Sequence, residues 1–279
     1  MKLLAWISVN ELIPVPQTLL ERIIERFDKK HSIYKNTSHR QVFQQLKKAG
    51  VDGVELLISV HSSEKSISIV RKKLKSYNMP VVSVHQPLYY GRKVVTSDIE
   101  NLCKIAKGFK SQVIVLHVTT LRQQLLDPEF VNSLSELQKK YKVIFGIENM
   151  PKKAFSSDSF TYKGKDFANV VRSKNLHMTF DATHLAQVGE DILSFYRKNN
   201  KEIVNIHLSD YKRNWVNVHL ISQIYSHLPL GEGELPMDEF LSLLRKVKYD
   251  GLITLEVNAG LTKLCDSARF VNKYLKRVI

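Results

Sequence analysis

Residues 113–148 read VIVLHVTTLRQQLLDPEFVNSLSELQKKYKVIFGIE, with two short apolar runs on either side of a longer amphipathic segment. The runs Val113–His117 and Val143–Glu148 are rich in Val, Ile and Leu, which is typical of strands buried on both faces of a parallel sheet. Between them, Asp127 followed by Pro128 combines an N-cap residue with proline at the first helical position, so a helix is predicted to begin there. The stretch therefore predicts two parallel strands joined by a right-handed helical crossover.

The same alternation continues in both directions along the chain. Amphipathic segments with apolar residues at helical spacing, such as Arg40–Ala49, Pro236–Val247 and Cys265–Val278, separate the strand-like runs. Eight strand–helix units in 279 residues fit a closed α/β barrel, so we predict a single (β/α)8 TIM-barrel domain over residues 1–279. A helical or loop insertion is expected at 11–38, and 211–233 forms a second long connection. The six further strand-like runs are Leu3–Val9, Gly53–Ile58, Val81–His85, His177–Asp181, Ile203–Leu208 and Ile253–Val257.

The composition narrows the class of protein. With 43% hydrophobic and 25% charged residues, the chain is expected to fold, and a disordered protein is excluded. No apolar run approaches the roughly 18 residues of a membrane span, and no cleavage site follows the N-terminus, so we expect a cytoplasmic protein without a membrane partner. Cys103 and Cys265 are too few for a disulfide scaffold or a cysteine-built zinc site. The net charge of +15 favours a phosphorylated or polyanionic ligand.

Six successive strand-like runs have His, Asp or Glu at the last or next-to-last position. In a barrel, the C-terminal ends of the strands meet at one mouth, where the active sites of these enzymes lie. Carboxylates gathered there would repel one another, so a cation is expected among them. Imidazole and carboxylate ligands without sulfur suit zinc or manganese, with magnesium, cobalt or iron as alternatives. The residues are His85, His117, Glu148, Asp181, His207 and Glu256.

Several short strings resemble one known family, the xylose-isomerase-like TIM barrel superfamily. It includes sugar phosphate isomerases and epimerases and the endonuclease IV enzymes that act on abasic DNA. The resemblance extends from about Arg40 to the C-terminus. The strings are HQP at 85–87, GIENMP at 146–151, FDATH at 180–184, HLSDYK at 207–212, HLPLGEGELPMDEFL at 227–241 and YDGLITLEV at 249–257.

The resemblance to the epimerases implies one divalent ion and a sugar or sugar phosphate substrate. Its implied activity is an isomerisation or epimerisation by proton transfer through a metal-stabilised enediolate. The implied metal ligands are Glu148, Asp181, His207 and Glu256, and the implied catalytic residues are Glu148, Glu256, His184 and Arg213. Residues expected to bind the substrate are His85, His117, His184, Lys212, Arg213 and Trp6.

The resemblance to endonuclease IV implies a different activity, that of a metal-dependent phosphodiesterase with abasic DNA as its partner. His85, His117 and His227 would then be further ligands, and a second ion would be bound. However, Tyr225 stands where that group has an Asp, and Leu88 stands where it has a DNA-wedging Tyr. The isomerase is therefore the first hypothesis and the nuclease the second, with a metal-binding module that does not turn over its ligand as the third.

Overall fold

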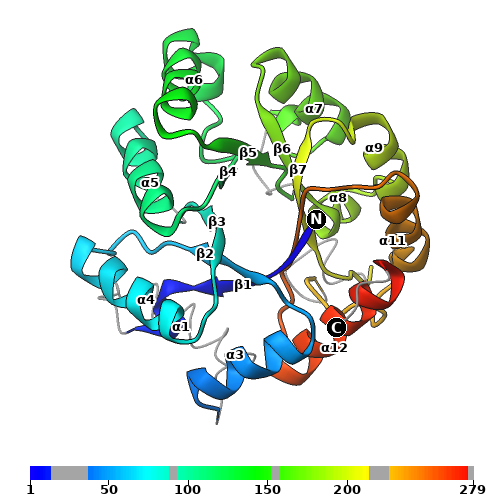
Figure 1. Cartoon of the computed structure of the whole chain (residues 1–279). Coiled ribbons are helices and arrows are strands. Elements are labelled where there is room, and N and C mark those ends of the chain that lie inside the picture. The colour runs from blue at the N-terminus through cyan, green and yellow to red at the C-terminus, as the bar shows by residue number, and fades with distance from the viewer. Residues whose placement is uncertain (14–36, 88–92, 152–157, 214–225, 276–279) are drawn as a thin grey trace.

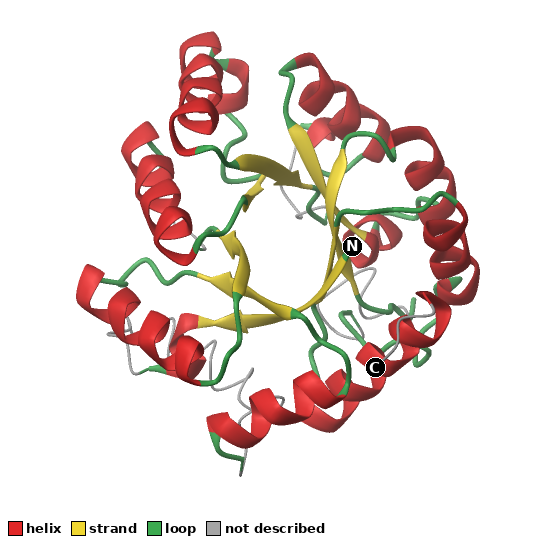
Figure 2. Cartoon of the chain, in the orientation of Figure 1, coloured by secondary structure: helices red, strands yellow, loops and turns green. Residues whose placement is uncertain are grey.

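Eight parallel strands close into a barrel in the computed structural model, in the order β1 to β8 with β8 paired to β1. The structure describes residues 1–13, 37–87, 93–151, 158–213 and 226–275. Figures 1 and 2 show the strands as an inner ring with the helices around it. The predicted (β/α)8 barrel is confirmed.

The strands lie close to the predicted runs. The two largest differences are at the ends of the chain, where Val9 begins a helix instead of ending a strand, and where the last strand ends at Leu255, before Glu256. The strands are β1 Lys2–Ser8, β2 Gly53–Leu57, β3 Val81–His85, β4 Val113–His117, β5 Ile144–Glu148, β6 His177–Asp181, β7 Ile203–Leu208 and β8 Leu252–Leu255.

The helices begin where the sequence provides caps. Asp127 accepts a hydrogen bond from the backbone N–H of Glu129 ahead of Pro128, as predicted. The last helix begins at Leu261, four residues before the predicted start at Cys265. The helices are α1 Val9–Leu12, α3 His39–Lys48, α4 Glu64–Ser76, α5 Thr96–Phe109, α6 Pro128–Tyr141, α7 Gly164–Ser173, α8 Ala182–Gln187, α9 Ile192–Asn199, α11 Met237–Lys246 and α12 Leu261–Leu275, with 3-10 helices η2 Gln124–Leu126 and η3 Ser159–Thr161.

Parts of two predicted segments fall outside the described residues. These are 14–36 of the predicted insertion and 214–225 of the long connection, and the insertion as a whole stays a prediction. Both cysteines are free and buried. Among the helices that the structure describes, none is long and apolar enough to cross a membrane.

The apolar core lies mainly between the barrel and its helices. On α3, Val42, Phe43 and Leu46 are buried on one helical face, as the spacing predicts. Phe180 on β6 packs against Phe240 on α11, with ring centroids 6.0 Å apart. The helices thus cover the outer side of the sheet, while several side chains inside the barrel are polar.

Replacing Phe240 with Ala should destabilise the fold, because this ring is fully buried and also packs edge-on against Tyr196 at 5.5 Å. We expect a loss of about 3–5 kcal/mol in the free energy of unfolding, measured by urea denaturation. The control is Leu126→Ala, since Leu126 is 60% exposed and its loss should change that free energy by less than about 0.5 kcal/mol. Equal effects of the two substitutions would contradict the packing described.

Candidate metal centre

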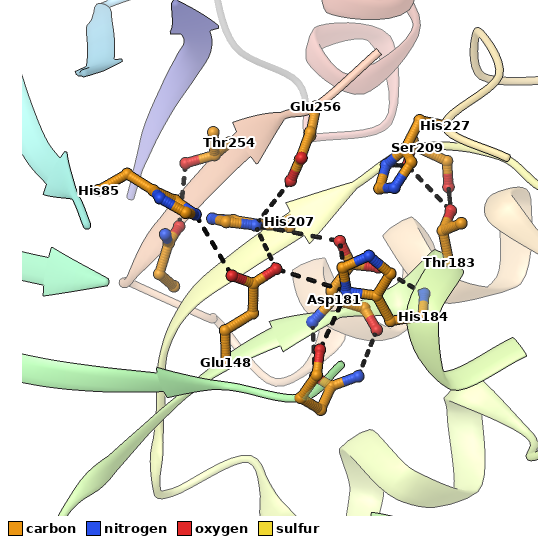
Figure 3. A network of polar contacts seen from close by, with 12 residues as sticks. His85, Glu148, Asp181, Thr183, His184, His207, Ser209, His227, Thr254 and Glu256 are labelled. Atoms are coloured by element: carbon orange, nitrogen blue, oxygen red, sulfur yellow. Dashed lines mark hydrogen bonds and ion pairs between the residues drawn. The ribbon is translucent and has the colours of Figure 1, made fainter. Parts of the chain in front are cut away.

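The predicted ligands meet at one mouth of the barrel. His85, His117, Glu148 and Asp181 are the last residues of β3 to β6, and register pairs His117 with Glu148. Glu256 follows β8 directly, and its backbone N–H still donates to the carbonyl of Leu208. Figure 3 shows His85, Glu148, Asp181 and Glu256 converging around His207. The structure thus brings together side chains that the sequence spreads over residues 85–256.

His207 Nδ1 is the centre of the cluster. It lies 2.9 Å from Glu256 Oε2, 3.2 Å from Glu148 Oε1 and 4.0 Å from Asp181 Oδ2. These four residues each offer one ligand atom, and the atoms all lie within 4.8 Å of one another. Asp181 Oδ2 is buried and has no hydrogen-bond partner among the described residues. Three carboxylates therefore face one imidazole nitrogen, which is an arrangement that a single divalent cation would satisfy.

A second group of potential ligands lies beside the first. His85 Nε2 and His117 Nε2 are each 3.3 Å from the same oxygen, Glu148 Oε2. The two rings contact each other edge-on, with centroids 4.8 Å apart. Glu148 therefore offers Oε1 to the first group and Oε2 to the second, so it could bridge two ions.

A third group consists of Asp181, His184 and His227. The two histidine rings meet edge-on at 5.2 Å, and His184 Nδ1 lies 3.6 Å from Asp181 Oδ2. Asp181 belongs to this group and to the first one, just as Glu148 belongs to the first and the second.

Hydrogen bonds with backbone carbonyls orient two of the histidines. His85 Nδ1 lies 2.9 Å from the carbonyl oxygen of Gln86, and His184 Nδ1 lies 3.0 Å from that of Asn149. A carbonyl oxygen only accepts, so each Nδ1 carries the proton in these bonds. In the neutral ring the lone pair is then on Nε2, which is the protonation that a metal ligand requires.

His227 is placed by a tight turn. Its φ of +52° is in the left-handed region, which is uncommon for a residue other than glycine. Ser209 Oγ lies 3.1 Å from His227 Nδ1, and Thr183 Oγ1 lies 2.9 Å from Ser209 Oγ. Asp210 accepts hydrogen bonds from three backbone N–H groups and lies against Gly233, where a Cβ atom would collide with its carboxylate. The turn in the HLPLGEGE string thus fixes the position of His227.

The pKa shifts show how the negative charges of the carboxylates are compensated without an ion. Burial favours a neutral Glu148, but the charge of His207 and the hydrogen bonds from His117, His207 and His85 together outweigh it and hold the pKa of that carboxyl well below its usual range. The pKa of Glu256 is lowered to about 2, because His227 and His207 together exceed the opposing effect of burial. Burial also opposes a charged His207, yet the carboxylates around it raise its pKa well above the ordinary value. For Asp181 burial dominates and raises the pKa. Protons on histidines therefore hold the carboxylates together, and a cation would take their place.

One residue of the cluster, Glu55 on β2, was not predicted from the sequence. It is fully buried, and its Oε1 lies 2.7 Å from His207 Nε2. The signal was present, since a Glu in the middle of the apolar run GVELL has to find a polar partner inside the barrel.

Of the remaining predicted substrate contacts, Trp6 lies beside His85, whereas Lys212 and Arg213 lie on the surface. The ring of Trp6 meets that of His85 edge-on at 6.5 Å, and its Nε1 is buried with no hydrogen-bond partner among the described residues. Lys212 and Arg213 are exposed, and the backbone N–H of Arg213 donates to Glu234 at 3.4 Å. Their predicted substrate contacts stay predictions. Leu88 and Tyr225, where the sequence departs from the endonuclease pattern, fall outside the described residues.

Residues 43–274 match the family described as xylose isomerase-like TIM barrel. An uncharacterised protein of Mycobacterium leprae is 26% identical over 84% of this chain and 92% of its own length.

Three solved structures of under 25% identity share the fold. A D-tagatose 3-epimerase-like protein has a TM-score of 0.65 at 21% identity, over 99% of this chain and 97% of its own. The 3-keto-D-glucoside 4-epimerase of E. coli has a TM-score of 0.65 at 14% identity, over 98% of this chain and 99% of its own. A xylose isomerase-like TIM barrel protein of Mycobacterium smegmatis in complex with magnesium has a TM-score of 0.58 at 13% identity, over 85% of this chain and 87% of its own.

The stabilisation that a divalent ion gives should increase with pH. Binding requires an unprotonated His207 Nδ1, whereas the raised pKa of His207 keeps the metal-free ring protonated, so binding releases a proton. The rise in Tm on adding zinc or manganese should therefore be larger at pH 8 than at pH 6.

In the metal-free protein, the stability that His207 contributes should instead fall as the pH rises. The stability that His207 contributes is complete below its unfolded pKa, about 6.5, and is lost as the pH rises through its higher folded value. Thermal unfolding with and without the ion, at several pH values, measures both trends. A metal-induced shift in Tm that is largest at acidic pH would contradict this account of the centre.

Proposed function

Because the chain belongs to the xylose isomerase-like TIM barrel family, we propose that it is a divalent-metal-dependent isomerase or epimerase of a sugar or sugar phosphate. The observation that carries the proposal is the group around His207 Nδ1, in which Glu148, Asp181 and Glu256 offer three carboxylates to the same point. The names of the epimerases that share the fold support a sugar substrate.

The residues present fit a divalent ion. The donor set contains only nitrogen and oxygen, and Asp181 Oδ2 is buried without a hydrogen-bond partner among the described residues, so it is free to bind an ion. Glu148, Asp181, His207 and Glu256 would hold the ion, with zinc or manganese as the first choice and magnesium, cobalt or iron as alternatives. A bound ion would supply positive charge for the oxygens of a substrate as negative charge develops on them.

Glu148 and Glu256 are the proposed acid and base. They come from β5 and from the end of β8 and approach His207 from opposite sides (Figure 3). One carboxylate would take the proton from the carbon beside the carbonyl group, and the electrons of that C–H bond would form the enediolate. A proton would then be returned to the opposite face or to the neighbouring carbon. The Glu256 side chain is 22% exposed and that of Glu148 only 2%, so the two would differ in contact with solvent.

Other residues would orient the substrate. His184 is 7% exposed, with its Nδ1 engaged by a carbonyl, which leaves Nε2 for a substrate oxygen. The indole N–H of Trp6 is a second buried donor near His85. Lys212 and Arg213 follow Tyr211 on the surface, and we propose that they bind a phosphate or another anionic group.

A specific observation also favours the second candidate, a phosphodiesterase acting at abasic sites in DNA. His85 and His117 share Glu148, and His184 and His227 share Asp181, so the cluster offers ligands for more than one ion. Enzymes that cleave phosphodiesters commonly use two or more ions to activate water and to bind the phosphate oxygens.

Loss of either proposed acid–base group should abolish exchange of the substrate proton. We expect Glu148→Gln and Glu256→Gln each to lower the rate of deuterium incorporation from D2O at least about 100-fold, across a panel of sugars and sugar phosphates. Metal content is measured in parallel, so that loss of the ion is told apart from loss of the base. Glu129→Gln, at an exposed position, is the control and should be unaffected. Failure of the metal-loaded wild type to exchange any compound of the panel would overturn the proposal.

The two candidates are separated by a second assay. Metal-loaded protein is incubated with duplex DNA that carries one abasic site, beside an active endonuclease as control. The isomerase proposal predicts that the DNA stays intact, since Lys212 and Arg213 would serve a small substrate. Incision that is lost in His85→Ala, with Glu148, Asp181, His207 and Glu256 unchanged, would establish the phosphodiesterase instead.

A further inference from the structure

Glu55 is a carboxylate inside the barrel, where apolar branched residues usually dominate. It is fully buried on β2 and reaches β7 and β8, which are not its neighbours in the sheet, so these contacts run through the interior. Burying a carboxylate is costly unless hydrogen bonds and an opposite charge compensate it.

The two oxygens of Glu55 have different partners. Oε2 accepts hydrogen bonds from Ser83 Oγ at 2.6 Å, Asn205 Nδ2 at 2.8 Å and Thr254 Oγ1 at 3.3 Å. Oε1 lies 2.7 Å from Nε2 of His207. Three donors from three other strands thus fix the carboxylate, while its second oxygen is directed to the histidine at the centre of the site.

The contact with Oε1 determines which nitrogen of His207 faces the cluster. Glu55 Oε1 and His207 Nε2 are in ion-pair contact, and neither atom has a hydrogen-bond partner among the described residues. An anionic oxygen this close to Nε2 favours the proton on that nitrogen, so in the neutral ring the lone pair is on Nδ1. Nδ1 is the nitrogen that faces Glu256 and Glu148, at 2.9 and 3.2 Å. Among the other site histidines, Nδ1 of His85 and Nδ1 of His184 each donate to a backbone carbonyl, and Nδ1 of His227 lies within hydrogen-bond distance of the Ser209 hydroxyl.

We propose that Glu55 is a positioning residue of the metal centre, which holds His207 with Nδ1 toward the ion and strengthens that nitrogen as a donor. A carboxylate behind a ligating histidine fixes the ring and its tautomer and increases its basicity. The inference rests on the proposed function, because it assumes that an ion binds at Glu148, Asp181, His207 and Glu256.

The test is the metal affinity of Glu55→Gln, which keeps the shape of the side chain and removes its charge. We expect the Kd for zinc, measured by competition with a chelating dye, to rise 10–100-fold with an unchanged number of ions. Glu129→Gln, an exposed position on α6, is the control and should bind as the wild type does. Glu55→Asp should give a smaller loss than Glu55→Gln, because it retains the charge.

The outcomes separate the possible roles of Glu55. An unchanged Kd together with a lower Tm of the metal-free variant would mean a purely structural role and would overturn the inference. Loss of one bound ion would make Glu55 itself a ligand and would overturn it as well. If the wild-type chain binds no divalent ion, both the proposed function and this inference fail. If the wild type binds the ion and Glu55→Gln binds it equally well, only this inference fails.

A second measurement needs no variant and remains decisive if Glu55→Gln does not fold. In wild-type protein loaded with zinc, the 15N chemical shifts of the His207 ring should show a protonated Nε2 and a ligating Nδ1. Coordination through Nε2 would overturn the inference.

Discussion

The structure is organised by the crowding of three carboxylates, two buried and one partly buried, around one imidazole nitrogen. Glu148, Asp181 and Glu256 offer oxygens within 4.8 Å of one another, facing His207. At that separation and an effective dielectric constant of about 20, two such charges repel by roughly 3 kcal/mol per pair. The fold would lose this energy unless protons on the histidines or a bound cation compensated it. The hydrogen bonds that orient the histidine rings and the turn that carries His227 both serve this arrangement.

The contacts that stabilise the barrel and the residues of the site lie in different layers of the fold. Stability comes largely from the apolar layer between the strands and their helices, as in the contact of Phe180 with Phe240. The interior below the mouth is instead partly polar, with Glu55 bonded to Ser83 and Asn205. Parallel strands bring six ligand-type residues to one end without a long loop being needed to position them, so the site is held on rigid elements.

The sequence predicted the fold and the outline of the site, because both depend on local patterns. Strand-like runs repeat along the chain, and the six His, Asp and Glu residues predicted at or near the ends of the last six runs lie together in the structure. Glu55 was missed because its partners are distant in sequence, Ser83 by 28 residues and Thr254 by 199, and no local pattern shows which strand faces which across a barrel. The left-handed conformation of His227 likewise depends on the surrounding turn. The role of Arg213 came from a resemblance and that of Lys212 from its charge beside the site, and their exposed positions leave those roles as proposals.

The most direct test of the metal centre is anomalous X-ray diffraction from crystals of the protein grown with zinc or manganese, at the absorption edge of the ion. We expect a strong peak about 2.0–2.2 Å from His207 Nδ1 and from oxygens of Glu148, Asp181 and Glu256. Further peaks beside His85 and His117, or beside His184 and His227, would extend the centre to more than one ion. A crystal with the ion in solution and no peak at His207 would contradict the central claim.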